Sequence, residues 1–214
     1  MGKHMNHNTN KTYYEYLAKC ILETFLPSAF SDIILTDKPD LINSGRDGIE
    51  VTRALFAGDG EASGRFQRIK DKPIDEIDKR DLTRLEQLDC DVMYFDGKAG
   101  GYCPPAHWCT LSEIQESFTA KLNKASTYGN TASLFIYSPM FNWYEPGMME
   151  EFTQWASALQ RARETGFSTV YVFEYTSLYI CDLATQEVIK IDLEHDAVQK
   201  CCESALEYVK QLEE

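Results

Sequence analysis

The sequence predicts an α/β protein in which a central mixed β-sheet is flanked by helices. Helical and strand patterns alternate along 214 residues, of which 43% are hydrophobic, and this is enough for one well-buried domain. The run ASLFIYS at 132–138 is almost wholly apolar, as in a strand that is covered on both faces. No repeat, low-complexity tract or linker divides the sequence, so we expect a single domain over residues 13–214.

The first elements are a helix and three short strands. YYEYLAKCILETFL at 13–26 places apolar residues on one helical face and is stopped by Pro27. SDIILT at 31–36 and PDLIN at 39–43 have the composition of strands, and the turn NSGRDG leads into a third strand, IEVTRAL, at 49–55.

Residues 56–111 break this regular pattern, and we expect them to be an insertion in the core. They contain a charged helix near 74–88, a strand at 90–95 and a loop rich in Gly, Pro and Cys. We interpret residues 46–72 as a mobile loop that closes over substrate. Its acids nearly balance the cations that would form a phosphate-binding rim: Arg53, Arg65, Arg68, Lys70 and Lys72.

The second half of the chain continues the α/β pattern. A helix is expected at 112–126, where Ser112 is a plausible N-cap with Gln115 three residues on. The strand at 132–138 follows it. The remaining elements are a helix at 148–164, a strand at 168–175, a hairpin at 178–193 and a helix at about 194–212.

The bulk composition limits the classes of function. A net charge of −13 disfavours a general nucleic-acid binder, but it permits an enzyme that gathers carboxylates around a metal ion and meets DNA through a narrow basic rim. Seven irregularly spaced cysteines indicate reduced thiols in the cytoplasm. We expect no membrane contact, because no apolar run approaches the roughly 20 residues that cross a bilayer. Residues 1–12 lack a signal-peptide core and are expected to be disordered or a cloning remnant.

Two acids, Asp40 and Glu50, lie on what the pattern predicts to be adjacent strands. Carboxylates that converge repel each other, and their burial is costly unless a cation or a proton lies between them. Hard carboxylate oxygens suit Mg²⁺, which uses one or two protein carboxylates and keeps several waters. A metal held in this way makes water nucleophilic and stabilises charge that develops on a phosphate.

These residues resemble the motif of the PD-(D/E)XK nuclease superfamily, the restriction-endonuclease-like proteins. PD at 39–40 is followed, after a turn, by EVT at 50–52, and the frame is one helix, three strands, a later helix and a strand. The resemblance covers residues 13–55 and 112–138, and the rest of the chain is peripheral to it.

The resemblance implies a restriction-endonuclease-like core and a nuclease that hydrolyses phosphodiester bonds with Mg²⁺ or Mn²⁺. Asp40 and Glu50 would be metal ligands, together with the carbonyl of Val51. DNA is favoured over RNA as the nucleic-acid partner. Many nucleases of this architecture act as dimers, so a homodimer is an open expectation.

The sequence departs from the family pattern two residues after the glutamate, where Thr52 replaces the motif lysine. On the helix at 112–126, Lys121 falls inside the apolar stripe rather than opposite it. Some members of the superfamily carry the catalytic lysine on this helix, and Lys121 looks like such a migrated residue, placed to orient water and stabilise the transition state. Thr52, Arg53 and Lys124 are candidates for contacts with the substrate.

Many relatives add an acid on the first helix, and Glu15 is the better candidate here because it sits nearer the apolar face than Glu23. Simpler roles stay open for each residue. Asp40 could be a turn residue, Glu50 the solvent-facing member of its strand, Lys121 a lysine that covers the core edge, and Glu15 part of a solvated flank.

Two alternatives concern the whole protein. Because of Thr52 and the acidic charge, the chain could be a catalytically inactive nuclease-like scaffold that binds a protein partner in a defence, immunity or regulatory system. A zinc site of Cys90, Cys103, His107 and Cys109 is a weaker alternative, since the spacing matches no strong zinc-finger pattern.

Overall fold

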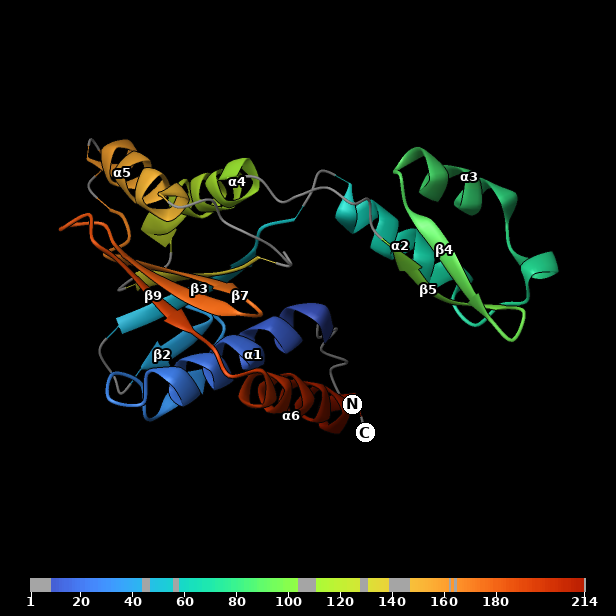
Figure 1. Ribbon diagram of the computed structural model, residues 1–214, viewed down its shortest axis with the longest axis horizontal. Coiled ribbons are helices and arrows are strands. Elements are labelled where there is room, and N and C mark those ends of the chain that lie inside the picture. The colour runs from blue at the N-terminus through green and yellow to red at the C-terminus, as the bar shows by residue number, and fades with distance from the viewer. Residues whose placement is uncertain are drawn as a thin grey trace, which may run out of the picture. The chain divides into compact units, whose positions relative to one another are not determined.

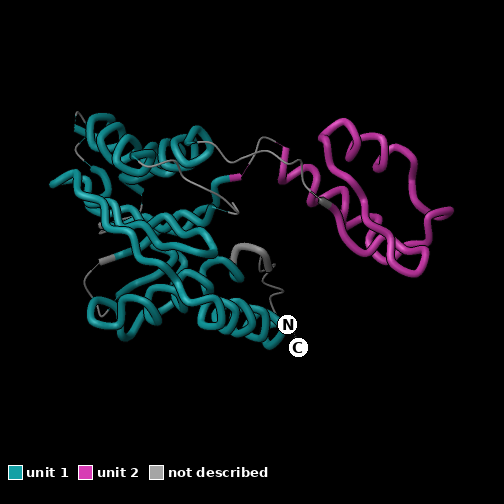
Figure 2. Tube along the Cα trace, in the orientation of Figure 1, with its two compact units in different colours: residues 1–54, 110–214 teal, residues 55–109 magenta. Residues whose placement is uncertain are grey.

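The computed structural model describes residues 9–43, 47–55, 58–103, 111–127, 131–138, 147–161, 163 and 165–213. The chain forms two compact units (Figure 2). Unit 1 combines Met1–Ala54 with Thr110–Glu214, and unit 2 is Leu55–Cys109. Unit 2 occupies the part of the sequence where an insertion at 56–111 was expected.

A seven-stranded mixed sheet forms the centre of unit 1, which confirms the predicted α/β class. The strand order is β1-β2-β3-β6-β7-β8-β9. The pairs β3/β6 and β6/β7 are parallel, and the other neighbours are antiparallel. The strands are β1 Ile33–Leu35, β2 Leu41–Asn43, β3 Asp47–Arg53, β6 Thr131–Tyr137, β7 Thr169–Glu174, β8 Ser177–Asp182 and β9 Val188–Asp192.

Helices cover both faces of this sheet (Figure 1). One face carries α1 (Thr9–Phe25) and α6 (His195–Glu213), and the other carries α4 (Leu111–Leu122) and α5 (Met148–Gln160). The α1 side buries the apolar stripe predicted for this helix, including Leu17 and Ile21. On the α4 side, the ring of Phe118 packs edge-on against Phe152 and Phe167, with centroids 5.8 and 5.9 Å apart.

The alternation of side chains along β3 sorts them between these two layers. Ile49 and Val51 belong to the core that α1 covers, so Glu50 lies on the opposite face, toward α4. Because helices cover both faces of this interior strand, Glu50 is only 2% exposed. The alternative that Glu50 is a solvent-facing residue is therefore wrong.

Unit 2 is built from two helices and a hairpin around a small core. Its members are α2 Asp59–Ile69, the 3₁₀ turn η1 Ile74–Glu76, α3 Lys79–Gln87, β4 Asp91–Phe95 and β5 Lys98–Cys103. β4 and β5 form an antiparallel two-stranded sheet. The buried residues that join these elements are Ala62, Phe66, Ile69, Ile77, Leu85, Cys90 and Ala99.

Two predictions for this region are wrong. The expected mobile loop at 46–72 contains β3 and helix α2, and the expected loop after β4 contains strand β5. β5 was not predicted because its sequence is rich in glycine, which is a poor strand former. These glycines fit a close contact: a Cβ at Gly100 would lie 2.3 Å from Cδ2 of Phe95 on β4.

Element boundaries shift at several other places. α1 begins at Thr9, before the expected start at residue 13. The helix expected at 112–126 ends at Leu122 and is followed by a 3₁₀ turn, η2 Ala125–Thr127. Residues 1–8 lie outside the described part of the chain. In the part that is described, every helix is too short or too polar to pass through a bilayer.

Candidate functional site

Asp40, Glu50 and Lys121 meet in unit 1, and we call them the carboxylate–lysine cluster. The Nζ atom of Lys121 donates a hydrogen bond to Oε2 of Glu50 at 2.6 Å and lies 3.6 Å from Oδ2 of Asp40. Both acids are 2% exposed as residues, and 19% of the lysine side chain is exposed. The arrangement is a buried ion-pair network with two carboxylates and one ammonium group.

Neighbouring strands hold the two acids. Asp40 directly precedes β2, whose first residue, Leu41, pairs with Ile49 on β3. The Oδ2 atom of Asp40 reaches across this antiparallel pair and accepts a hydrogen bond from the backbone N–H of Val51 at 2.8 Å. This bond fixes the carboxylate of Asp40 beside the strand that carries Glu50.

Helix α4 brings the lysine to the acids. Lys121 lies in its last turn, and Ser117, one turn earlier, donates a hydrogen bond from Oγ to the carbonyl of Arg53 at 2.9 Å. This bond ties α4 to the end of β3. Ser117 was missed in the sequence, although its spacing of four residues from Lys121 places both polar groups on the same helical flank.

The electrostatics of the cluster favour an additional positive charge. Burial raises the pKa of Glu50, and the neighbouring carboxylate of Asp40 raises it further, while the hydrogen bond from Lys121 acts in the opposite direction. One ammonium cannot neutralise two carboxylates. A proton or a cation bound at this place would therefore be stabilised.

The remaining predicted site residues have varied surroundings. Glu15 is buried at 8% exposure on α1, so the alternative of a solvated flank is wrong; α1 packs on the face of the sheet opposite α4. The guanidinium of Arg53 stacks on the ring of Tyr14 at 4.7 Å. Thr52 is half-buried in β3, and Lys124 is exposed just after α4. The roles of these residues remain predictions.

In unit 2, two arginines of the expected phosphate-binding rim are bound to an acid of the same unit. Arg65 and Arg68 both form ion pairs with Asp81, at 2.9 and 2.6 Å, so they are part of an internal network rather than a mobile loop. Two members of the alternative zinc group, His107 and Cys109, lie outside the described residues, and Cys90 is buried in the unit 2 core. The described residues contain no cluster of three or more metal-ligating His, Cys, Asp or Glu side chains.

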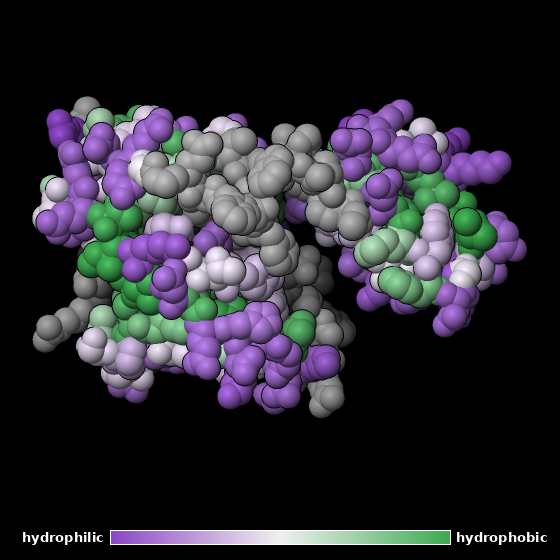
Figure 3. Space-filling view, viewed as in Figure 1, coloured by the Kyte–Doolittle hydropathy of each residue, from purple (hydrophilic) through white to green (hydrophobic). Residues whose placement is uncertain are grey.

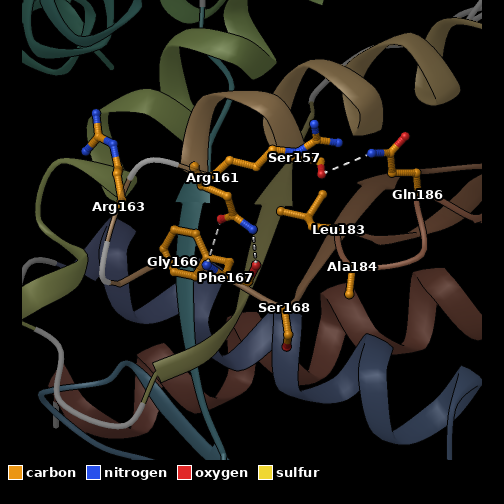
Figure 4. Close-up of a pocket in the computed structure, with 10 residues that line it drawn as sticks. Ser157, Arg161, Arg163, Gly166, Phe167, Ser168, Leu183, Ala184 and Gln186 are labelled. Atoms are coloured by element: carbon orange, nitrogen blue, oxygen red, sulfur yellow. Dashed lines mark hydrogen bonds between the residues drawn. The ribbon is translucent and has the colours of Figure 1, made fainter.

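A separate hollow lies where the end of α5 meets the start of β7 (Figure 4). The side chain of Gln160 clamps the backbone of Phe167, donating to its carbonyl at 2.8 Å and accepting from its N–H at 3.0 Å. The described lining has arginines, including Arg161, but no Asp or Glu. This hollow shares no residue with the carboxylate–lysine cluster and offers no carboxylate for a hard divalent cation.

Comparison with known proteins finds no match for this chain among family models, curated proteins or solved structures. Any functional conclusion therefore depends on the chemistry of the site.

Proposed function

We propose that the protein is a metal-dependent nuclease of the PD-(D/E)XK type, which hydrolyses phosphodiester bonds in DNA. The observation that carries the proposal is the position of the Lys121 ammonium, 2.6 Å from Glu50 and 3.6 Å from Asp40 in a buried site. The nitrogen comes from the helix before β6 rather than from position 52 of β3.

The order of elements in unit 1 supports the proposal. A helix is followed by three antiparallel strands, a second helix and a strand parallel to the third, and this is the frame in which the motif resembles the superfamily. Asp40 directly precedes β2 and Glu50 lies within β3, so the acids occupy the sequence positions on which the motif depends. The departure at Thr52 is balanced by Lys121.

The donor set fits Mg²⁺ or Mn²⁺. Asp40 and Glu50 provide hard oxygen ligands, and among the three side chains of the carboxylate–lysine cluster negative charge exceeds positive charge. Mg²⁺ needs only one or two carboxylates. When bound, the ion would supply Lewis-acid chemistry for phosphoryl transfer. The carboxylates of Asp40 and Glu50 would hold it.

The chain's own residues prepare the site for hydrolysis. The N–H of Val51 holds one oxygen of Asp40, and Lys121 holds one oxygen of Glu50, so both carboxylates are oriented before any ligand binds. A water attacks phosphorus, the P–O bond to the leaving oxygen breaks, and a proton passes to that oxygen. Lys121 stabilises the negative charge that develops on the phosphate oxygens.

The test is cleavage of labelled duplex DNA, single-stranded DNA and RNA with and without Mn²⁺ or Mg²⁺. Wild-type protein should cleave DNA only with metal, and Asp40→Ala, Glu50→Ala and Lys121→Ala should each lower the rate by at least about 100-fold. The matched control is Lys19→Ala. Lys19 forms an ion pair of the same length, 2.6 Å, with Glu23 on α1, and its side chain is similarly exposed at 21%.

The outcomes separate the nuclease from the scaffold alternative. Full cleavage by Glu50→Ala would contradict the assignment of the site. No cleavage by wild-type protein, with no rise in melting temperature on adding Mn²⁺, would leave the cluster as a structural ion pair in an inactive scaffold. If Lys19→Ala lowered the cleavage rate as much as Lys121→Ala, the effect of removing an ion pair would come from folding alone.

A further inference from the structure

The outer side of α3 in unit 2 carries a concentration of positive charge that is unusual for this acidic chain. A shallow hollow there is lined without any acidic residue, and we call its lining the cationic face: Arg65, Lys79, Arg80, Thr83, Arg84 and Gln87. Residues 65–84 hold seven of the chain's 21 lysines and arginines against five acids, so this stretch has a small positive balance in a chain whose net charge is −13. Figure 3 shows hydrophilic surface along α3.

Part of this charge is fixed by internal ion pairs. Arg84 grips both oxygens of Glu61 at 2.9 Å, and Arg65 contacts Glu61 and Asp81. Arg68 also binds Asp81, at 2.6 Å. Three arginines thus share two carboxylates, and the network that joins α2 to α3 keeps an excess of positive charge.

The other cations are available to a ligand. Lys79 and Arg80 are exposed, and neither has an ion-pair partner among the residues that the structure describes. Arg80 and Gln87 lie on one side of α3 at helical spacing, on either side of Arg84, whose guanidinium is already bound to Glu61. The helix rises about 10 Å from Arg80 to Gln87, while phosphates of one DNA strand rise about 3.4 Å each along the duplex, so the span between these two side chains matches about three phosphates.

We propose that the cationic face of unit 2 binds the phosphodiester backbone of nucleic acid. The proposal rests on the proposed nuclease function and adds to it a second surface, separate from the carboxylate–lysine cluster, that holds the substrate. A row of cations with interspersed Thr83 and Gln87 donors matches a repeating phosphate chain. An anionic membrane fits less well, because helices that bind membranes bury an apolar face, and this row has none.

The experiment measures binding of full-length protein to a short fluorescein-labelled DNA duplex by anisotropy, in EDTA so that no metal-dependent cleavage occurs. The variant is Lys79→Gln/Arg80→Gln, which keeps the side-chain stems and removes two charges without breaking the internal ion pairs. The matched control, Lys70→Gln/Lys98→Gln, removes two exposed charges from the same unit outside the cationic face. Circular dichroism melts check that both variants fold like wild type.

We expect the magnitude of the slope of log affinity against log salt concentration to be smaller in the variant by about 1.8. If both proteins bind equally at about 1 M salt, this difference makes the variant bind the duplex about 60-fold more weakly than wild type at about 0.1 M salt. The control should change affinity by less than about threefold. Equal losses in both variants, or no loss in either, would overturn the proposal, as would binding of wild type to phosphatidylserine vesicles but not to the duplex.

A parallel cleavage assay in Mn²⁺ separates this proposal from the nuclease assignment. Wild-type cleavage together with unchanged binding by Lys79→Gln/Arg80→Gln would refute the cationic face and leave the nuclease standing. Weakened binding by this variant in a protein that cleaves nothing would support the face and refute the nuclease.

Discussion

Replacing Lys121 with methionine tests the environment of the carboxylate–lysine cluster directly. Methionine has nearly the same length as the apolar stem of lysine and removes only the ammonium, which lies 2.6 Å from Glu50 and 3.6 Å from Asp40. The side chains of both acids are 3% exposed. The variant therefore leaves two buried carboxylates close together without the ammonium group that Lys121 supplies.

The loss in the free energy of unfolding that Lys121→Met causes can be estimated from the burial of the cluster. Removing one partner of a buried ion pair destabilises a protein by about 3–5 kcal/mol, and the 19% exposure of the Lys121 side chain places the expected loss near about 3 kcal/mol at neutral pH. Lys19→Met is the control, since its pair with Glu23 has the same 2.6 Å length but an acid that is 25% exposed. Solvent screening limits the ion-pair contribution in the control to about 1 kcal/mol or less, and the loss of the hydrogen bond from Lys19 Nζ to the carbonyl of Ile33, 2.7 Å long, adds about 1 kcal/mol.

Urea denaturation followed by circular dichroism measures both losses. In Lys121→Met the pKa of Glu50 is raised without opposition from the lysine, so the folded state binds a proton more strongly than the unfolded chain. Its stability should be highest at acidic pH and should fall as the pH rises through the raised pKa. Equal losses in the two variants, or a Lys121→Met deficit that does not shrink in acid, would refute this reasoning.

Three further measurements follow from the same structure. Burial raises the pKa of Glu50 above its ordinary value of 4.5, so the free energy of unfolding of wild type should decline as the pH rises from about 4.5 through the raised pKa. Urea titrations of Glu50→Gln should show a flatter decline. An unchanged slope would contradict the direction of the shift. Asp40→Ala should lose about 1–3 kcal/mol, because the buried N–H of Val51 loses its acceptor, and a loss near zero in the same assay would show that another group replaces it. Hydrogen bonds from Arg84 and a second arginine lower the pKa of Glu61 to about 2, so its stabilising contribution is present above 4.5 and is lost as the pH falls through about 2. Carbon-13 NMR should find the Glu61 inflection near 2, and an inflection near 4.5 would show that the ion pairs do not form in solution.

The elements with strong local patterns were predictable from the sequence. The apolar run at 132–138 is strand β6, and the amphipathic patterns near both ends of the chain are α1 and α6. α2 was missed because its sequence has two glycines and buries only Ala62, Phe66 and Ile69. Such weak patterns become regular structure only where a second element, here α3, offers apolar surface to pack against.

The candidate site divides in the same way. Lys121 lies within an apolar stripe, and this indicated that its side chain enters the interior. The face of a helix on which a residue lies follows from its spacing in the sequence alone. Its contact with Glu50 joins residues that lie 71 positions apart, and it depends on how α4 packs against β3. The sequence left the solvent-facing alternative for Glu50 open for the same reason.

By itself, the sequence determined which residues share a face: Glu50 opposite Ile49 and Val51 on one strand, and Lys121 among apolar residues on one helix. Only the tertiary structure decided what covers each face. α4 buries the Glu50 side of β3 and brings the lysine to it, whereas the arginines of α2 and α3 neutralise acids within unit 2. The physical reason is that side-chain direction follows from local backbone geometry, while burial and charge pairing depend on which distant segment packs there.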